Sequence, residues 1–255
     1  MKSSDKQQNG SLSVCVLIPT YNNDQTLRKV IEDSLSYCPK TMVVNDGSTD
    51  STASIIDGFA DRIISLSYSR NKGKGHALRK GLEEARRRGF THAITLDSDG
   101  QHFPEDIPLF IKAAKAHPEA LIVGSRDLQA ENMPGGNSFA NRFSNFWFHV
   151  QTGLRLPDTQ TGYRLYPLDR LPNLHWLSAR YEAELMLLVA SAWKNVPLLP
   201  MPVRVYYPPA GERVSHFRPF ADFFRISLLN VGLCVTDMVY AWPRKLIRKI
   251  TGGHD

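Results

Sequence analysis

Two acidic residues separated by one position follow an apolar segment near the middle of the chain. Asp97 and Asp99 come directly after residues 93–96, which are expected to form a strand. Successive strand residues point to opposite faces, so both carboxylates can lie on one side at the end of this strand. Carboxylates this close repel each other unless a cation lies between them. A hard ion such as Mg2+ or Mn2+ would take their oxygens and the amide oxygen of Gln101, and would keep positions open for substrate phosphates.

The same stretch has a structural alternative. In an ordinary loop between a strand and a helix, Asp97 or Asp99 would accept hydrogen bonds from the first N–H groups of the next helix. A short acidic motif alone does not decide between these interpretations. The placement of the other polar motifs favours a metal site that binds a nucleoside diphosphate.

Apolar segments alternate with polar turns through the first half of the chain. The segment 14–18 is continuously apolar, which is typical of a central parallel strand covered on both faces, and further strands are expected at 41–44, 63–68 and 93–96. Helices with apolar residues every three or four positions lie between them, and residues 22–24 are expected to cap the first helix. This alternation predicts a doubly wound, mainly parallel α/β sheet, in which ligands bind beyond the carboxyl ends of the strands.

Each of the four expected strands is followed by a polar motif. The motifs are Pro19-Thr20-Tyr21-Asn22, Asn45-Asp46-Gly47-Ser48, Asn71-Lys72-Gly73-Lys74-Gly75 and Asp97-Ser98-Asp99-Gly100-Gln101. Because the carboxyl ends of parallel strands share one edge of a sheet, the four motifs are expected to converge there.

The composition is that of one globular domain with an anionic partner. Of the 255 residues 42% are hydrophobic and 22% are charged, and the net charge of +6 favours phosphates, an acidic membrane surface or nucleic acid. Since no basic stripe with interleaved aromatic residues occurs before residue 200, nucleic acid is not an expected partner. We expect a disordered tail without a signal peptide at 1–11 and an α/β domain at 12–215. Three unrelated cysteines, Cys15, Cys38 and Cys234, indicate reduced thiols and a cytoplasmic protein.

In this order, the four motifs resemble the signatures of family-2 glycosyltransferases with the GT-A fold. The Gly73-Lys74-Gly75 turn and the Asp-x-Asp-x-Gln-His run at 97–102 are most similar to the dolichyl-phosphate mannose synthase and polyprenyl-phosphate glycosyltransferase branch. The similarity extends from Val14 to Arg218. It implies an inverting transferase that uses Mg2+ or Mn2+ to move a sugar from a GDP- or UDP-sugar to a lipid-linked acceptor, most simply polyprenyl or dolichyl phosphate.

The resemblance also implies roles for individual residues. The implied nucleotide-sugar contacts are Pro19, Thr20, Tyr21, Asp46, Lys74 and Asp97. The implied metal ligands are Asp97, Asp99 and Gln101. The implied catalytic group is Asp99, Arg126, Arg204 and Glu184, and the implied contacts to an acceptor phosphate are Arg204, Ser215 and His216. Simpler roles stay open for three of them: Asp46 in capping a turn, Lys74 as a solvated lysine, and Arg126 in an ion pair near Asp127.

Three departures from the branch stand out. Residues 208–212 are inserted between Arg204-Val205-Tyr206 and Ser215-His216, and His216 occupies the usual position of a lysine. Histidine carries less positive charge at neutral pH, which weakens the expectation of a phosphate acceptor. Asn23 occupies the usual position of a glutamate, which puts contacts to the donor base in question.

The chemistry depends on the acceptor. A polyprenyl phosphate is already an anion, so its attack on the anomeric carbon requires no general base. A lipid hydroxyl must lose a proton, and Glu184, Glu182 or Asp158 are the candidate bases. The two glutamates also suit the first turn of a helix, where acids are stabilising.

Residues 216–255 are aromatic and apolar and end in a basic cluster at 244–249. The stretch without basic residues, 226–243, is shorter than the roughly 20 apolar residues that a membrane span requires. We expect an amphipathic helical segment at the cytosolic membrane face, with packing on the core or on a second copy as the alternative.

Two further function classes are alternatives to a glycosyltransferase. A nucleotidyltransferase also has a parallel sheet and metal-binding acids, but it usually opens with a glycine-rich turn, whereas Pro19-Thr20-Tyr21 follows the first strand here. A non-catalytic nucleotide-sugar-binding module would not need the acid pair.

Overall fold

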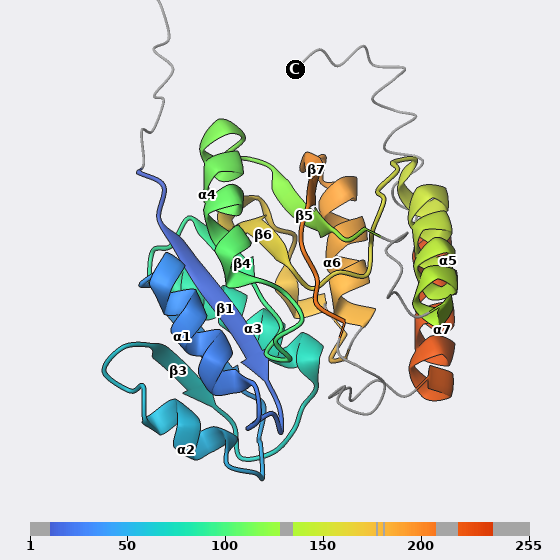
Figure 1. Ribbon diagram of the computed structural model, residues 1–255. Coiled ribbons are helices and arrows are strands. Elements are labelled where there is room, and N and C mark those ends of the chain that lie inside the picture. Colours follow the sequence, from blue (N-terminus) through green and yellow to red (C-terminus); the bar gives the residue numbers. More distant parts are fainter. Residues whose placement is uncertain (1–10, 128–134, 177, 181, 208–218, 237–255) are drawn as a thin grey trace, which may run out of the picture.

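The computed structural model describes residues 11–127, 135–176, 178–180, 182–207 and 219–236. They form a three-layer α/β fold in which one seven-stranded sheet lies between two layers of helices (Figure 1). The strands are β1 Val14–Thr20, β2 Thr41–Asn45, β3 Ile64–Ser67, β4 His92–Thr95, β5 Leu121–Ser125, β6 Arg164–Pro167 and β7 Leu198–Pro202. The α-helices are α1 Leu27–Tyr37, α2 Thr52–Asp57, α3 Lys74–Arg87, α4 Ile107–Ala116, α5 Gly135–Thr152, α6 Glu182–Trp193 and α7 Pro219–Thr236. Short 3-10 helices are η1 Pro104–Asp106, η2 Leu168–Arg170 and η3 Leu174–Trp176.

The strand order is β3-β2-β1-β4-β6-β5-β7, with β1 and β4 near the centre. The first four strands pair in parallel, as the sequence predicts. β6 runs antiparallel to both of its neighbours, β4 and β5, and makes the sheet mixed. The mainly parallel α/β sheet flanked by helices is therefore confirmed, with one reversed strand inserted into it.

Two apolar clusters fill the spaces on the two faces of the sheet. Side chains alternate along β1, so Cys15 and Leu17 enter the cluster under α3, α5, α6 and α7, while Val16 and Ile18 enter the cluster under α1, α2 and α4. This explains the unbroken apolar character of the strand. Cys15 and Cys38 are buried, the three cysteines are unpaired, and burial raises the pKa of the Cys15 thiol to about 12.

The expected helix cap at residues 22–24 is wrong. α1 begins at Leu27, its N-cap residue is Thr26, and no side chain caps it. The Asn23 side chain instead donates a hydrogen bond to Ser98. The loop after β1 therefore forms a side-chain hydrogen bond with the acidic turn and does not cap the helix.

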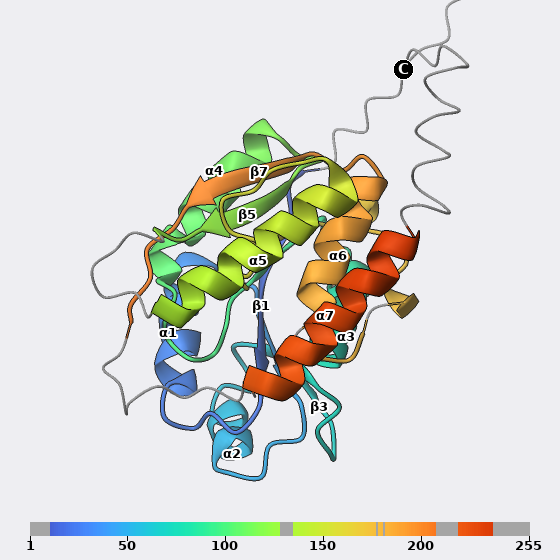
Figure 2. The ribbon, with the colours of Figure 1, turned by 90° about the vertical axis from the view of Figure 1, so that its right-hand side faces the viewer.

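α7 packs against α5 and α6, on the side of the molecule that faces the viewer in Figure 2. The Gln151 side chain on α5 donates to Asn230 on α7, and Leu233 is buried in the core. Val231 and Val235 point outward and are 59% and 55% exposed. The described part of the C-terminal segment therefore uses one face for the core and leaves another open, while the basic cluster at 244–249 lies outside the described residues.

Candidate functional site

The loops that follow the carboxyl ends of the first four strands are hydrogen-bonded to one another. The Asn22 N–H donates to Ser48 Oγ at 2.9 Å, which joins the loops after β1 and β2. Asp46 joins the loops after β2 and β3, and Asn23 joins the loop after β1 to the turn after β4. The predicted convergence of the four motifs is thus observed.

Asp46 is buried and holds the lysine-bearing loop. Its carboxylate accepts hydrogen bonds from the N–H groups of Lys72 at 3.0 Å and Gly73 at 2.6 Å. Desolvation raises the pKa of Asp46 in spite of these two donors. In this structure Asp46 therefore has the turn-supporting role that the sequence left open, and a contact to the nucleotide stays a prediction.

The end of β1 supplies the other predicted nucleotide contacts. Pro19 and Thr20 are buried, and Tyr21 after them is half-buried. Thr20 Oγ1 has no hydrogen-bond partner among the described residues. A buried hydroxyl without a partner is unusual, and a ligand group at the rim would satisfy it.

Lys74, at the start of α3, lies between two carboxylates. Its ammonium is 2.7 Å from Asp97 Oδ1 and 3.2 Å from Glu184 Oε2. Burial alone would lower the pKa of Lys74, but the charges of Asp97 and Glu184 outweigh it and raise this pKa. The lysine is therefore fully protonated, and the interpretation of Lys74 as a solvated surface lysine is wrong in this structure.

Asp97 and Asp99 differ in electrostatic environment. Burial would raise the pKa of Asp97, but the nearby ammonium of Lys74 lowers it overall. The pKa of Asp99 rises to about 6, first because the side chain is desolvated and then because Asp97 is negatively charged. Asp99 Oδ1 accepts the Gln101 N–H at 3.0 Å, so its other oxygen is the better placed for a ligand. Neither aspartate caps α4, which follows η1 and has no side-chain cap.

The donor set suits Mg2+ or Mn2+. It consists of two carboxylates on one turn, one of them with a raised pKa that a cation would relieve, and the amide of Gln101 two residues later. Among the residues that the structure describes, no group of three or more histidine, cysteine or acidic side chains is placed to hold a metal. A site with so few protein ligands matches ions that keep open positions for water and phosphate oxygens.

Arg126 follows β5 and forms a two-pronged ion pair with a buried acid. Its Nε is 2.6 Å from Asp158 Oδ2 and its Nη2 is 3.0 Å from Asp158 Oδ1. Asp158 also accepts from Asn141 at 2.5 Å and from the Gln160 N–H at 3.0 Å. The partner of Arg126 is therefore Asp158 rather than a group near Asp127. With its oxygens already engaged and fully buried, Asp158 is poorly suited to act as a general base.

Arg204 lies beside the acidic turn. The Tyr206 N–H donates to the Gln101 carbonyl at 2.8 Å, and an isolated bridge pairs His102 with Val205. The Arg204 side chain is 59% exposed and donates to Asp106 Oδ1 at 2.8 and 3.0 Å. It is thus held at the rim with much of its surface open, whereas Ser215 and His216 lie outside the described residues.

Arg164 is a residue of this region that sequence reasoning did not single out. It is fully buried at the start of β6, where it donates to the Glu184 carbonyl at 2.7 Å and to the Thr159 carbonyl at 2.9 Å. It therefore fixes the start of α6, which carries Glu184, against the loop that carries Asp158. Its place in the polar loop 158–164 was the available signal, but the burial of its charge depends on contacts distant in sequence.

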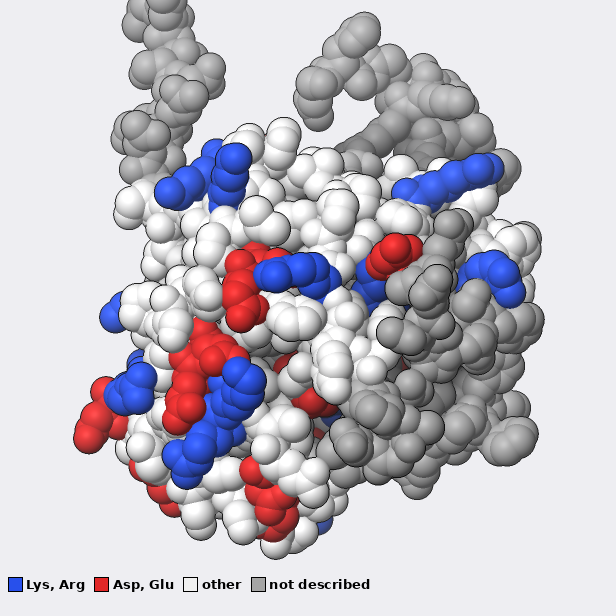
Figure 3. Space-filling model, viewed as in Figure 1, with Lys and Arg blue, Asp and Glu red and all other residues white. Residues whose placement is uncertain are grey.

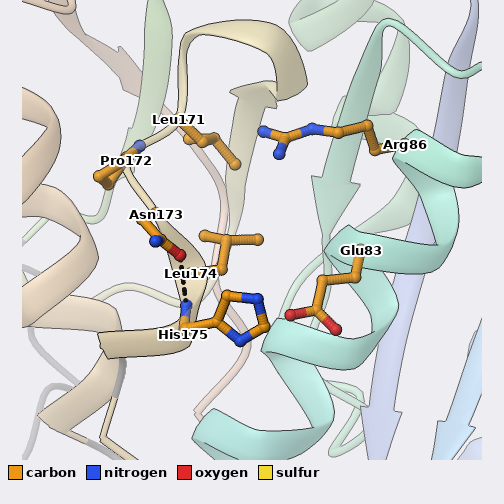
Figure 4. Close-up of a pocket in the computed structure, with 7 residues that line it drawn as sticks. All are labelled: Glu83, Arg86, Leu171, Pro172, Asn173, Leu174 and His175. Atoms are coloured by element: carbon orange, nitrogen blue, oxygen red, sulfur yellow. Dashed lines mark hydrogen bonds between the residues drawn. The ribbon is translucent and has the colours of Figure 1, made fainter.

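A separate cavity lies at the edge of the sheet where the parallel strands begin, opposite the carboxyl ends that carry the acid pair. Its volume is about 460 Å3, and it lies between the later turns of α3, with Glu83 and Arg86, and the segment 171–175 (Figure 4). β6 reaches this edge at Pro167, which pairs with the first residue of β4. The cavity is thus not part of the candidate site.

Charge is mixed on the face of the molecule drawn in Figure 3. Basic and acidic side chains are interspersed there. The positive net charge therefore does not gather into one basic surface on this face.

Gly162 gives a direct test of how tightly Asp97 is held. A Cβ atom at this position would lie 2.5 Å from Asp97 Oδ2, so Gly162→Ala is expected to displace the carboxylate from Lys74. A shift of about 1 Å in a catalytic group lowers turnover roughly 100-fold, which is the loss expected in kcat/KM. Gly232→Ala is the control, because a Cβ there meets nothing within 4 Å. Equal activity of both variants would show that the position of Asp97 is unimportant.

Comparison with known proteins points to one family. The family model described as glycosyl transferase family 2 matches residues 15–163. A UDP-N-acetylglucosamine–dolichyl-phosphate N-acetylglucosaminyltransferase of Methanococcus voltae is 25% identical over 242 residues, which cover 86% of this chain and 96% of that protein. A polyprenol monophosphomannose synthase of Mycolicibacterium smegmatis is 30% identical over 168 residues, which cover 62% of this chain and 63% of the relative.

Solved structures support the fold. Glucosyl-3-phosphoglycerate synthase from Mycobacterium tuberculosis, crystallised with Mn2+, UDP and glucosyl-3-phosphoglycerate, superposes with a TM-score of 0.62. The match covers 89% of this chain and 80% of that chain at 17% sequence identity. The similarity is therefore one of architecture, the GT-A-like sheet with its flanking helices.

Proposed function

Since this chain belongs to glycosyl transferase family 2 and is an enzyme of that family, we propose that it transfers a sugar from a GDP- or UDP-sugar to a polyprenyl or dolichyl phosphate, with inversion at the anomeric carbon. The observation that carries this proposal is the meeting of Asp97, Asp99 and Lys74 at the carboxyl edge of the sheet. The names of the two relatives, which include dolichyl phosphate and polyprenol, supply the acceptor class.

One group of residues is proposed to bind the donor and another to bind the acceptor. Asp97, Asp99 and Gln101 would hold Mg2+ or Mn2+, which supplies positive charge to the diphosphate leaving group. Lys74 and Arg126 add protein cations, and the planar guanidinium of Arg126 suits a diphosphate oxygen pair. Pro19, Thr20, Tyr21 and Asp46 line the part of the rim proposed for the nucleoside. Arg204, Ser215 and His216 are proposed for the acceptor phosphate.

A second candidate acceptor is a lipid hydroxyl, because one carboxylate is well placed to act as a base. Glu184 points to Lys74, which contacts Asp97 as well, so Glu184 belongs to the same cluster. A hydroxyl acceptor would pass its proton to this carboxylate. Glu182 is the other acid in the first turn of α6.

Thermal-shift screening tests the donor class. GDP- and UDP-sugars are compared with and without Mn2+, and a donor that binds the folded protein raises its unfolding temperature. Product analysis with polyprenyl phosphate and with a hydroxylated glycolipid then separates the two acceptors. Failure of every nucleotide sugar to bind, with and without Mn2+, would overturn the proposal.

We also propose that the enzyme works as a peripheral protein at the cytoplasmic membrane face. In the part of the chain that the structure describes, no helix combines the length and apolarity needed to cross a bilayer. Phe146 and Val150 on α5 and Val231 and Val235 on α7 are exposed on two helices that pack together. No acidic residue occurs from 140 to 157, where Arg142 and Arg155 are exposed. Apolar side chains beside basic ones suit an anionic lipid surface.

Charge placed on this surface is expected to weaken vesicle binding. Phe146→Glu combined with Val231→Glu should reduce co-sedimentation with phosphatidylglycerol-containing vesicles by about tenfold or more, because burying one such side chain contributes ~1.5–3 kcal/mol. Leu109→Glu is the matched control, since Leu109 is also exposed but lies on α4, on the other face of the sheet. Equal loss in the control would exclude this surface as the docking site.

A further inference from the structure

The loop after β1 forms hydrogen bonds with the acidic turn that contains Asp97 and Asp99. Ser98, between the two aspartates, is buried, and its hydroxyl accepts a hydrogen bond from Asn23 Nδ2 at 2.9 Å. The Thr26 hydroxyl lies 2.6 Å from the Ser98 carbonyl and 2.8 Å from Asn23 Oδ1, and its single hydrogen serves one of these acceptors at a time. Both the side chain and the backbone of Ser98 are thus in contact with this loop.

Asn23 is itself anchored on α2. It is buried, and its N–H donates to the hydroxyl of Thr52, a fully buried residue at the start of α2. A buried amide fixed by several hydrogen bonds has one orientation, because any rotation would leave polar groups unpaired. The position of Ser98 is therefore determined by residues far away in sequence.

We infer that Asn23 and Thr26 are positioning residues that hold Asp97 and Asp99 in the geometry needed to bind a divalent cation. The two carboxylates flank Ser98, so a rotation of the backbone at Ser98 would move both. The residues before Asn23 are those proposed to bind the nucleoside, so the nucleoside loop and the acidic turn would move as one unit. This inference rests on the proposed function, and it gives a local reason for asparagine where the family resemblance implies glutamate.

The test is the affinity for Mn2+, measured from the electron paramagnetic resonance signal of free Mn2+ in titrations with saturating UDP or GDP. Asn23→Ala, Thr26→Val and Ser98→Ala are each expected to weaken Mn2+ binding roughly tenfold or more, the usual effect of removing a residue that orients metal ligands. Thr26→Ser keeps the hydroxyl and should bind as the wild type does. Asn173→Ala, at an exposed position in the remote segment 171–175, is the control.

The double variant Asn23→Ala with Ser98→Ala separates positioning from general destabilisation. Both changes remove the same hydrogen bond between Asn23 and Ser98. The double variant should therefore bind Mn2+ no more weakly than the single variant that has the lower affinity. Additive losses, or unchanged affinity in folded Asn23→Ala, would overturn the inference. If Asn23→Ala does not fold, the comparison of Thr26→Val with Thr26→Ser decides it. Wild-type protein that binds no Mn2+ with either nucleotide would overturn the proposed function as well, whereas binding retained by every variant would overturn this inference alone.

Discussion

Asp99→Asn is expected to lower kcat/KM for the nucleotide sugar by about a thousandfold, because loss of metal assistance removes several kcal/mol of stabilisation and each ~1.4 kcal/mol is a factor of ten. The same variant should be at least as stable as the wild type at pH 8 without metal. Burial and Asp97 raise the pKa of Asp99 from 3.8 to about 6, so folding free energy is lost as the pH rises from the lower to the higher value, and the full loss is present above about 6. Enzymes commonly show such a trade-off between stability and activity, in which a residue needed for activity lowers the stability of the fold.

Steady-state kinetics with Mn2+ and thermal unfolding in a chelator give the two measurements. Asp169→Asn is the matched control, because Asp169 is exposed on η2 at the opposite edge of the sheet. Loss of activity together with a large loss of stability would mean that Asp99 has a structural role. A variant that retains both turnover and its dependence on Mn2+ would remove Asp99 from the metal site.

The largest effect on stability is expected from Asp158→Ala. The substitution would leave Arg126, whose side chain is only 14% exposed, without its partner and would remove the acceptor for Asn141 and the Gln160 N–H. Breaking a buried ion pair from one side costs about 3–5 kcal/mol of unfolding free energy. Urea denaturation of the metal-free protein measures this loss.

Two comparisons sharpen this prediction. Arg126→Met combined with Asp158→Leu should recover part of the lost stability, because no unpaired charge remains. The recovery should be incomplete, since the donors of Asn141 and Gln160 stay unsatisfied. A stable Asp158→Ala protein that has lost activity would instead support Asp158 as the general base, which its buried position argues against.

The parts of the fold that were predictable depend on local patterns. The apolar run of β1 indicated burial on both faces, and the rule that ligands bind at the carboxyl ends of parallel strands placed Asp46, Lys74 and Asp97 together. The reversed direction of β6 was not predictable in this way. A four-residue strand carries no signal for its direction, which is set by pairing with β4 and β5.

The same distinction applies to the site. Residue types and spacing identified the acid pair, and the family resemblance pointed to Arg126, but the partner of Arg126 lies 32 positions away and was found only in three dimensions. Asn23 was predicted to cap a helix because asparagine is a good cap in isolation, and a tertiary hydrogen bond to Ser98 took its place. Local propensity was outweighed by contacts distant in sequence.

The reversed strand β6 also determines which connections of this enzyme can vary without affecting catalysis. Because β6 runs against its neighbours, the segment that precedes it reaches the catalytic edge, with Gly162 beside Asp97, while the segment that follows it leaves at the far edge near Thr91. The exposed residues of the segment 171–175, Asn173 and His175, are consequently suitable attachment points for a dye or an affinity tag. A reporter placed there would leave the sugar-transfer chemistry undisturbed and would show whether the protein binds lipid vesicles.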